Sequence, residues 1–299
     1  MTGAALAVAS VVAYAVVVER NQFTLREISV PVLDKGSAPI RVLHLSDMHL
    51  APWQRGKARW VAELAGLRPD LVVSTGDNWG AKDAFDIIRD ALGPFAGIPG
   101  VFVFGSNDYD APRIKNPFGY FAGPSRATRQ PTALDSEGLR SFLTNSLGWD
   151  DLNNSATALS VAGRTIEFFG VDDPHHGHDD IDATRDALDS VRGVSGEPSL
   201  RIGLTHAPYA HSLAELSDLG ADILFAGHTH GGQVCLPGVG ALVTNCDLPR
   251  AQASGLSHFD SENGAIPLHV SAGLGTSIYA PVRFACPPEA TLLTLTARV

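Results

Sequence analysis

The chain has 299 residues, 44% of them hydrophobic, which is enough to bury a substantial core as one large domain or two modest ones. Its 22 Lys and Arg residues against 32 Asp and Glu residues give a formal net charge of −10, and no dense basic run appears. This balance argues against a broad surface for duplex nucleic acid. An acidic chain can still bind an anionic phosphate where bound cations are the largest local charges.

The N-terminal segment is apolar. From 4 to 18 every residue is apolar apart from one serine and one tyrosine, and no charge appears until Glu19. As a helix, about 17 such residues would be roughly 25 Å long, slightly short of a ~30 Å hydrocarbon core. A signal peptide is the alternative, but no basic segment precedes the run and no convincing cleavage site follows it. We expect an uncleaved, single-pass membrane anchor over 1–20, on a side of the membrane that the sequence leaves open, and one folded domain over 21–299.

Strands and helices alternate in the first half of that domain. Short apolar runs predict strands at 23–31, 40–46, 71–75 and 101–104, the first of them at a sheet edge. Amphipathic patterns predict helices near 58–67 and 84–92. Polar residues follow the ends of the last three strands, which is where the open sheets of α/β domains place their sites.

The pattern breaks between 110 and 131, where Pro, Gly, Arg and aromatic residues predict a cap or a loop insertion. Beyond it we expect a hairpin of 159–161 with 166–169. The remaining predictions are helices over 137–147, 181–191 and 209–219, strands at 200–204, 222–225, 268–271 and 291–295, and loops with short strands between 231 and 264.

Five polar sites follow these predicted strands. The last is Gly227-His228-Thr229-His230-Gly231-Gly232-Gln233, in which glycines let the chain turn and a strand would place both imidazoles on one face. Alone, this pair of histidines could be an accident of a loop. The other four sites carry Asp47 with His49, Asp77, Asn107 with Asp108, and His206.

Two aspartates, one asparagine and four histidines form a mixed oxygen and nitrogen set. Such a set suits Mn²⁺, Fe or Zn²⁺ and is too rich in nitrogen for Ca²⁺ or Mg²⁺ alone. Seven ligands are too many for one transition metal and about right for two that share a carboxylate. Two ions about 3.5–4 Å apart suit an in-line displacement at phosphorus. Hydrolysis of a phosphoester is the natural use of this set.

In this order and context, the five sites resemble the calcineurin-like metallophosphoesterase superfamily, from about Ile40 to the C-terminus. The Gly-His-Thr-His-Gly-Gly-Gln sequence and the apolar N-terminus are similar to its membrane-associated YaeI/YkuE-like branch. The resemblance implies a four-layer α/β/β/α metallophosphoesterase sandwich as the catalytic domain. It also implies hydrolysis of phosphodiester or pyrophosphate bonds, with lipid-linked or nucleotide-sugar substrates for some members of the branch.

The resemblance further implies two divalent metal ions (Mn, Fe or Zn) and a bridging hydroxide as nucleophile. The implied ligands are Asp47, His49, Asp77 and His230 for the first ion, and Asp77, Asn107, His206 and His228 for the second. Asp77 would bridge the two ions.

One site departs from the family pattern. The chain reads Gly105-Ser106-Asn107-Asp108-Tyr109, so that a serine precedes the asparagine and Asp108 stands where the family places a histidine that assists the leaving group. We expect Asp108, with Asp77, to act in catalysis by orienting a ligand or water, and we expect good leaving groups to be preferred. The alternative is a catalytically weak metal-binding module that recognises a phosphorylated headgroup or a partner at the membrane. A phosphomonoesterase is a second rival, distinguished by how far the cap closes the site.

Other polar residues are assigned structural roles. The histidine-rich stretch from Asp172 to His178 is expected to be a solvated or structural loop, because the five sites already supply a full ligand set. His44 lies within a strand and is expected to be a hydrogen-bonded core residue. Asn78 and Gln233 adjoin ligands and could fix histidine tautomers or simply occupy turns. The three cysteines follow no zinc-ribbon spacing, and buried or incidental thiols are expected.

Overall fold

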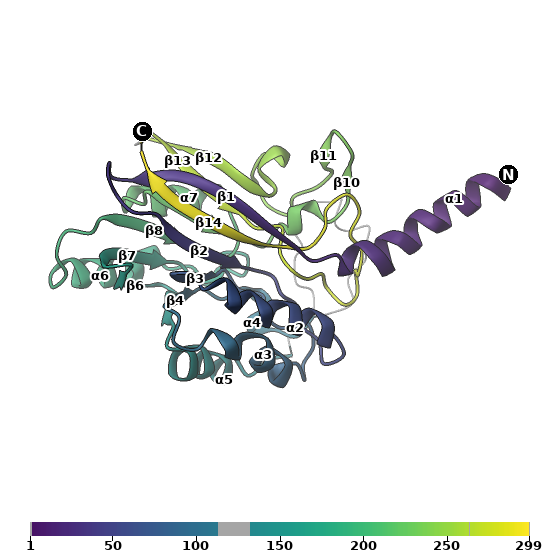
Figure 1. Ribbon diagram of the computed structural model, residues 1–299, viewed down its shortest axis with the longest axis horizontal. Coiled ribbons are helices and arrows are strands. Elements are labelled where there is room, and N and C mark those ends of the chain that lie inside the picture. Colours follow the sequence, from purple (N-terminus) through teal and green to yellow (C-terminus); the bar gives the residue numbers. More distant parts are fainter. Residues whose placement is uncertain (1, 113–131, 263, 299) are drawn as a thin grey trace.

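Two six-stranded sheets face one another in the computed structural model, which describes residues 2–112, 132–262 and 264–298. Helices cover the outer faces of both sheets (Figure 1). From residue 113 onward, the predicted cap over 110–131 lies outside the described residues.

The first sheet has the strand order β1-β14-β2-β3-β4-β5. Its strands are β1 Thr24–Leu33, β2 Ile40–Leu45, β3 Leu71–Ser74, β4 Gly100–Phe102, β5 Asp150–Asp151 and β14 Glu289–Ala297. β1 lies at the sheet edge, as its alternating pattern predicted, and pairs in parallel with β14. β2, β3 and β4 are parallel neighbours, so their carboxyl ends lie at the same edge of the sheet.

The second sheet has the order β12-β13-β9-β8-β7-β6. Its strands are β6 Ser155–Val161, β7 Arg164–Gly170, β8 Leu200–Leu204, β9 Ile223–Ala226, β12 Gly255–Ser261 and β13 Gly264–Val270. β6 and β7 form the predicted hairpin. β12, an edge strand of seven residues, lies in a stretch where we expected loops and only short strands. None of its side chains is fully buried, so no apolar run marks this strand in the sequence. A small hairpin, β10 Cys235–Leu236 with β11 Gly240–Ala241, stands apart from both sheets.

Three apolar clusters define four layers. Side chains from both sheets, including Val73, Phe168 and Phe225, form the core between them. One outer cluster joins the first sheet to its helices and another joins the second sheet to its own. The helices are α2 Arg55–Glu63, α3 Phe85–Leu92, the short α4 Ser106–Tyr109, α5 Ser136–Ser141 with a π-helical continuation Phe142–Leu147, α6 Ile181–Arg192 and α7 Ala210–Asp218. The predicted α/β layering is therefore present.

The N-terminal helix projects away from these layers (Figure 1). Helix α1 spans Thr2–Ala13 and is followed by a π-helical turn, Tyr14–Val18. Within the described part of the chain, no helix is both long and apolar enough to cross a membrane. The prediction of a spanning anchor over 1–20 is therefore not supported. The 12-residue α-helix is about 18 Å long, and Glu19 beyond it is bound into the domain, where its carboxylate accepts a hydrogen bond from the Cys286 amide at 2.7 Å.

The core between the sheets gives a stability prediction. Replacing the fully buried Phe168 with alanine leaves a cavity that both sheets border. We expect the free energy of unfolding, measured by urea titration, to fall by about 3–5 kcal/mol. Val194→Ala, at a side chain that is 90% exposed, should change it by less than about 0.5 kcal/mol. Equal effects of the two changes would contradict this assignment of the core.

Candidate metal centre

The predicted metal ligands lie at the carboxyl ends of strands from both sheets. Asp47 and His49 follow β2, Asp77 follows β3, Asn107 follows β4, His206 follows β8, and His228 and His230 follow β9. Among the described residues, two clusters of His and Asp atoms are tight enough to hold an ion: Asp47 with His49 and His230, and Asp47 with Asp77 and His206. The sites that are scattered along the sequence thus converge in space.

Most of these residues have an unusual backbone. Positive φ values occur at Asp47 (49°), His49 (40°), Asp77 (56°), His228 (67°) and His230 (51°). Left-handed backbone is uncommon for residues other than glycine and is concentrated at functional sites. Five of the seven predicted ligands therefore share a strained conformation that the surrounding loops must maintain.

The first group of ligand atoms comes from Asp47, His49, Asp77 and His230. The Nε2 atoms of His49 and His230 lie 3.2 Å apart. Asp77 Oδ2 lies 3.4 Å from Nε2 of His49, and Asp47 Oδ1 lies 3.6 Å from Nε2 of His230. All four side chains are buried, and Asp47 Oδ1 has no hydrogen-bond partner. Convergent nitrogens and an unpartnered buried carboxylate oxygen suit a cation.

The second group faces the other oxygen of Asp77. Nε2 of His206 lies 3.6 Å from Asp77 Oδ1 and 3.3 Å from Nδ1 of His228. The Nδ1 atom of His206 lies 2.6 Å from the Thr75 carbonyl oxygen, to which it donates, so Nε2 is the ring nitrogen that faces the group. The two Asp77 oxygens thus face two different groups of predicted ligand atoms.

Asn107 is tied directly to this carboxylate. Its backbone amide donates to Asp77 Oδ1 at 2.8 Å and its side-chain amide donates to Asp77 Oδ2 at 2.7 Å. The amide nitrogen is therefore used to hold Asp77. The role of Asn107 as a ligand, like the other ligand assignments, stays a prediction.

Burial and neighbouring charges set the protonation of the site. Burial lowers the pKa of His49 to about 4, although Asp77 opposes the shift, and it lowers the pKa of His228 and His230 well below the ordinary value. Burial would raise the pKa of Asp77, but His206 and His49 lower it overall. Neutral imidazoles and an ionised carboxylate are the forms that bind metal ions. His206 differs: burial would lower its pKa, but Asp77, Asp47 and Asp173 raise it to about 9, so a metal ion would displace its proton. With that proton released, the donor set fits divalent cations.

Asp108 does not face either ligand group. Its buried carboxylate accepts hydrogen bonds from the backbone amides of Asp77 (2.8 Å), Asn78 (2.8 Å) and Gly105 (3.1 Å), and from the side-chain amide of Asn78 at 3.1 Å. It therefore orients the loop that carries Asp77 and joins the loops after β3 and β4. Direct participation of Asp108 in catalysis stays a prediction. Asn78 contributes to this contact and not to a histidine tautomer.

Two buried basic side chains hold the ligand loops, and no motif pointed to either. The fully buried Arg283 guanidinium donates to five carbonyl oxygens, those of His230 (3.2 Å), Ala272 (2.8 Å), Gly273 (3.0 Å), Gly275 (2.6 Å) and Cys286 (3.3 Å). Lys57 in α2 donates to the carbonyl oxygens of Met48 (2.7 Å) and His49 (3.3 Å). Both side chains neutralise carbonyl dipoles beside the ligand residues. Neither Arg283 nor Lys57 lies in a recognisable motif, so the sequence did not predict these contacts.

Close approach explains two of the glycines. A Cβ atom on Gly105 would lie 2.4 Å from Asp77 Oδ1 and 2.6 Å from the His206 ring. A Cβ atom on Gly227 would lie 2.0 Å from the Ser46 hydroxyl. Any larger residue would displace ligand side chains, so glycine is required at both positions.

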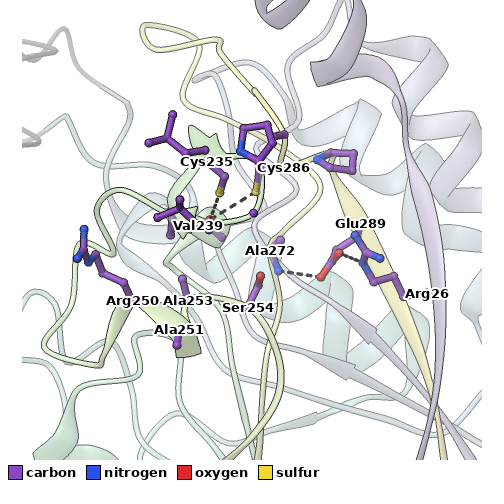
Figure 2. A pocket seen from close by; sticks show the side chains of 18 residues that line it. Arg26, Cys235, Val239, Arg250, Ala251, Ala253, Ser254, Ala272, Cys286 and Glu289 are labelled. Carbon is purple, nitrogen blue, oxygen red and sulfur yellow. Dashed lines mark hydrogen bonds and ion pairs between the residues drawn. The ribbon is translucent and has the colours of Figure 1, made fainter.

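A cavity of about 450 Å³ lies behind the loop that carries His230. Figure 2 shows Cys235 and Cys286 side by side in it, where both thiols donate to the carbonyl oxygen of Gly231, at 3.2 and 3.5 Å. The predicted metal ligands, all within the described residues, do not line this cavity. The cysteines therefore support the ligand loop from behind. His44 is likewise structural, because its ring nitrogens contact His269 (2.8 Å) and Thr75 (2.9 Å) in the core.

The Asp108 contacts give a prediction. In Asp108→Asn, an amide group replaces one acceptor and faces backbone N–H groups. We expect a loss of about 1–3 kcal/mol in the free energy of unfolding. We also expect about 10- to 100-fold weaker Mn²⁺ binding, because the loop that carries Asp77 loses its support. Urea titration and calorimetric Mn²⁺ titration measure the two effects. Asp90→Asn on the exposed side of α3 is the control, and wild-type values for both variants would contradict the role given to Asp108.

Comparisons with known proteins agree with this geometry. Residues 40–232 match the family model described as calcineurin-like phosphoesterase. The chain is 25% identical over 288 residues to the uncharacterized metallophosphoesterase YkuE of Bacillus subtilis, covering 93% of this chain and 85% of that protein. It is 26% identical over 300 residues to the phosphodiesterase YaeI of Escherichia coli, covering 98% of this chain and 96% of that protein. With more than half of its length matched, the chain belongs to the calcineurin-like phosphoesterase family, as a phosphoester hydrolase of the YaeI/YkuE-like branch.

Proposed function

We propose that the chain hydrolyses phosphodiester or pyrophosphate bonds at a centre of two divalent metal ions. The observation that carries this proposal is the Asp77 carboxylate, whose oxygens lie 3.4 and 3.6 Å from Nε2 of His49 and of His206. One carboxylate that faces two groups of ligand atoms suits a bridge between two ions. The mixed oxygen and nitrogen set favours Mn²⁺, Fe²⁺ or Zn²⁺.

The proposed ligands are Asp47, His49, Asp77 and His230 for one ion, and Asp77, Asn107, His206 and His228 for the other. When bound, the two ions would supply a bridging hydroxide as nucleophile and neutralise charge that develops on the phosphate oxygens. Burial keeps His49, His228 and His230 in the neutral form that binds a metal ion. The Thr75 carbonyl orients the His206 ring, and Asp108 fixes the loop that carries Asp77.

A second candidate is a catalytically weak metal-binding module that recognises a phosphorylated headgroup. The contacts of the Asp108 carboxylate favour this second candidate. The carboxylate accepts hydrogen bonds from four N–H groups that hold the loops, and it is therefore poorly placed to assist a leaving group. Metal binding without turnover distinguishes this candidate from the hydrolase.

We also propose that α1 attaches the protein to a membrane, and that lipid-linked phosphodiesters or pyrophosphates are among its substrates. The support is the exposed apolar surface of α1, which includes Leu6 (69% exposed), Val8 (65%) and Val12 (55%). Burial of this surface in lipid would be favourable, and the helix leaves the domain as a separate projection (Figure 1).

The metal proposal is tested with the full chain, stripped of metal and then supplied with Mn²⁺. We expect restored hydrolysis of bis-p-nitrophenyl phosphate. Asp77→Ala should reduce the rate by at least about 100-fold, because the loss of a bridging ligand should cost more than the 10- to 100-fold of an outer contact. Asp86→Ala, at a side chain that is 95% exposed, is the matched control. Turnover that survives Asp77→Ala would rule out the bridge, and Mn²⁺ binding without wild-type turnover would favour the second candidate.

The membrane proposal is tested by co-sedimentation of the full chain with phosphatidylcholine vesicles. The double change Val8→Asp with Val12→Asp should lower the bound fraction at least about tenfold, since a charged side chain costs ~2.5–3.5 kcal/mol within a membrane helix. Val194→Asp introduces a charge at another exposed valine and should bind like the wild type. Equal binding by all three proteins would exclude α1 as the attachment.

A further inference from the structure

Two cysteines that are far apart in the sequence meet behind the loop that carries His230. The Cys235 thiol donates a hydrogen bond to the Gly231 carbonyl oxygen at 3.2 Å, and the Cys286 thiol donates to the same oxygen at 3.5 Å. The two thiols are also within hydrogen-bonding reach of each other (Figure 2). The other members of their buried cluster are all alanines. The two sulfur atoms are therefore neighbours in a region built from small side chains.

Backbone hydrogen bonds hold the two segments that carry these cysteines together. The Cys235 amide donates to the Phe284 carbonyl oxygen at 2.8 Å, and the Phe284 amide donates to the Gln233 carbonyl oxygen at 2.9 Å. Segments paired like strands lie about 4.7–4.9 Å apart, and a disulfide joins Cα atoms about 4.4–6.8 Å apart. A bond between the two sulfur atoms is therefore compatible with the spacing of these segments.

The cavity behind the loop gives a small oxidant access to both sulfur atoms. Cys235 and Cys286 are 8% and 7% exposed, and both line this cavity of about 450 Å³. A water molecule occupies about 30 Å³ in the liquid, so a molecule as small as hydrogen peroxide fits readily. Cys246, also in the described part of the chain, does not line the cavity and packs in the outer cluster of the second sheet. Access and a nearby partner thus distinguish the pair from the third cysteine.

We propose that Cys235 and Cys286 are a modification site, at which a hydroperoxide converts the two thiols into an internal disulfide. With hydrogen peroxide, the first sulfur bonds to one oxygen, the O–O bond breaks, and the other oxygen leaves as water with the thiol proton. The second sulfur then bonds to the resulting sulfenic sulfur, whose hydroxyl leaves as water with the second thiol proton. The two sulfurs lose two electrons in all, and the peroxide gains them.

This bond would change the support of His230. The Cys286 thiol also donates to the His230 carbonyl oxygen, at 3.4 Å. A disulfide has no S–H group, so the Gly231 carbonyl would lose both thiol donors and the His230 carbonyl would lose one. Losing the donor of a buried carbonyl is unfavourable, so the loop should shift. We expect the disulfide to weaken metal binding at His230. This effect rests on the proposed function, whereas formation of the bond does not.

Labelling with N-ethylmaleimide in denaturant, counted by mass spectrometry, tests the bond in the metal-free full chain. The reduced chain has three cysteines and should take three labels. After hydrogen peroxide we expect one label, and dithiothreitol should restore three. Cys246→Ser should fall from two labels to none, and peptide mapping of Cys235→Ser should show no internal disulfide. Three labels on the peroxide-treated wild type, or a disulfide that includes Cys246, would overturn the modification site.

Calorimetric Mn²⁺ titration of the reduced and oxidised full chain tests the effect on His230. Oxidation should raise the Kd about 10- to 100-fold, as the loss of an outer contact of a metal ligand does, and dithiothreitol should reverse the change. Cys235→Ser keeps a hydroxyl donor beside Gly231 and cannot form the bond, so peroxide should leave its Kd unchanged.

The outcomes separate the two proposals. Equal Kd values for the oxidised and reduced wild type would overturn the effect on His230. If the disulfide forms but the reduced chain does not bind Mn²⁺, the proposed metal centre and this effect fail, and the modification site stands. If Mn²⁺ binds and supports hydrolysis but no disulfide forms, the modification site fails and the proposed function stands.

Discussion

The left-handed backbone at five of the predicted metal ligands is the constraint on which the site depends. Each such residue costs about 1–3 kcal/mol, so together they are comparable with the ~5–15 kcal/mol that keeps a whole domain folded. Strain of this size persists only where the surroundings fix it. Asp108 holds two of these loops in place by accepting hydrogen bonds from their backbone amides. Lys57 and Arg283 hold the loops by donating hydrogen bonds to backbone carbonyl oxygens. The charged groups that hold the loops are thus distinct from the side chains that face the ligand groups.

The buried polar atoms of the ligand groups are a second source of destabilisation. Without a cation, Asp47 Oδ1 is buried with no hydrogen-bond partner, and Nε2 atoms of two histidines face one another at 3.2 Å. A buried carboxylate oxygen without a donor is unfavourable, and Asp77 raises the pKa of the buried His206 to about 9, so a second buried charge stands beside it. A bound divalent cation would give Asp47 Oδ1 a partner. The sheets and their apolar core must therefore stabilise a site whose own groups are unfavourable when no ion is bound.

Much of this could be predicted from the sequence, for a physical reason. Buried parallel strands are short apolar runs, and their ends meet at one edge of the sheet, so Asp47 and Asp77 could be expected to converge. His206 follows a strand of the other sheet, and its place beside them depends on how the two sheets pack. The supports could not be predicted in this way. Arg283 and Glu19 are ordinary charged residues until the fold brings them to Gly275 and Cys286, contacts that no local pattern encodes.

The loop around His175 shows why a missing motif residue is weak evidence for a missing activity. The loop after β4 carries an asparagine and an aspartate, both engaged in holding Asp77 and its loop. An imidazole is nevertheless present beside the second ligand group, supplied by the loop after β7 and fixed by a tyrosine from the start of α7. A substrate meets positions in space and not an order of residues along a chain. A departure from one motif therefore has to be judged against every loop that reaches the same ligand group.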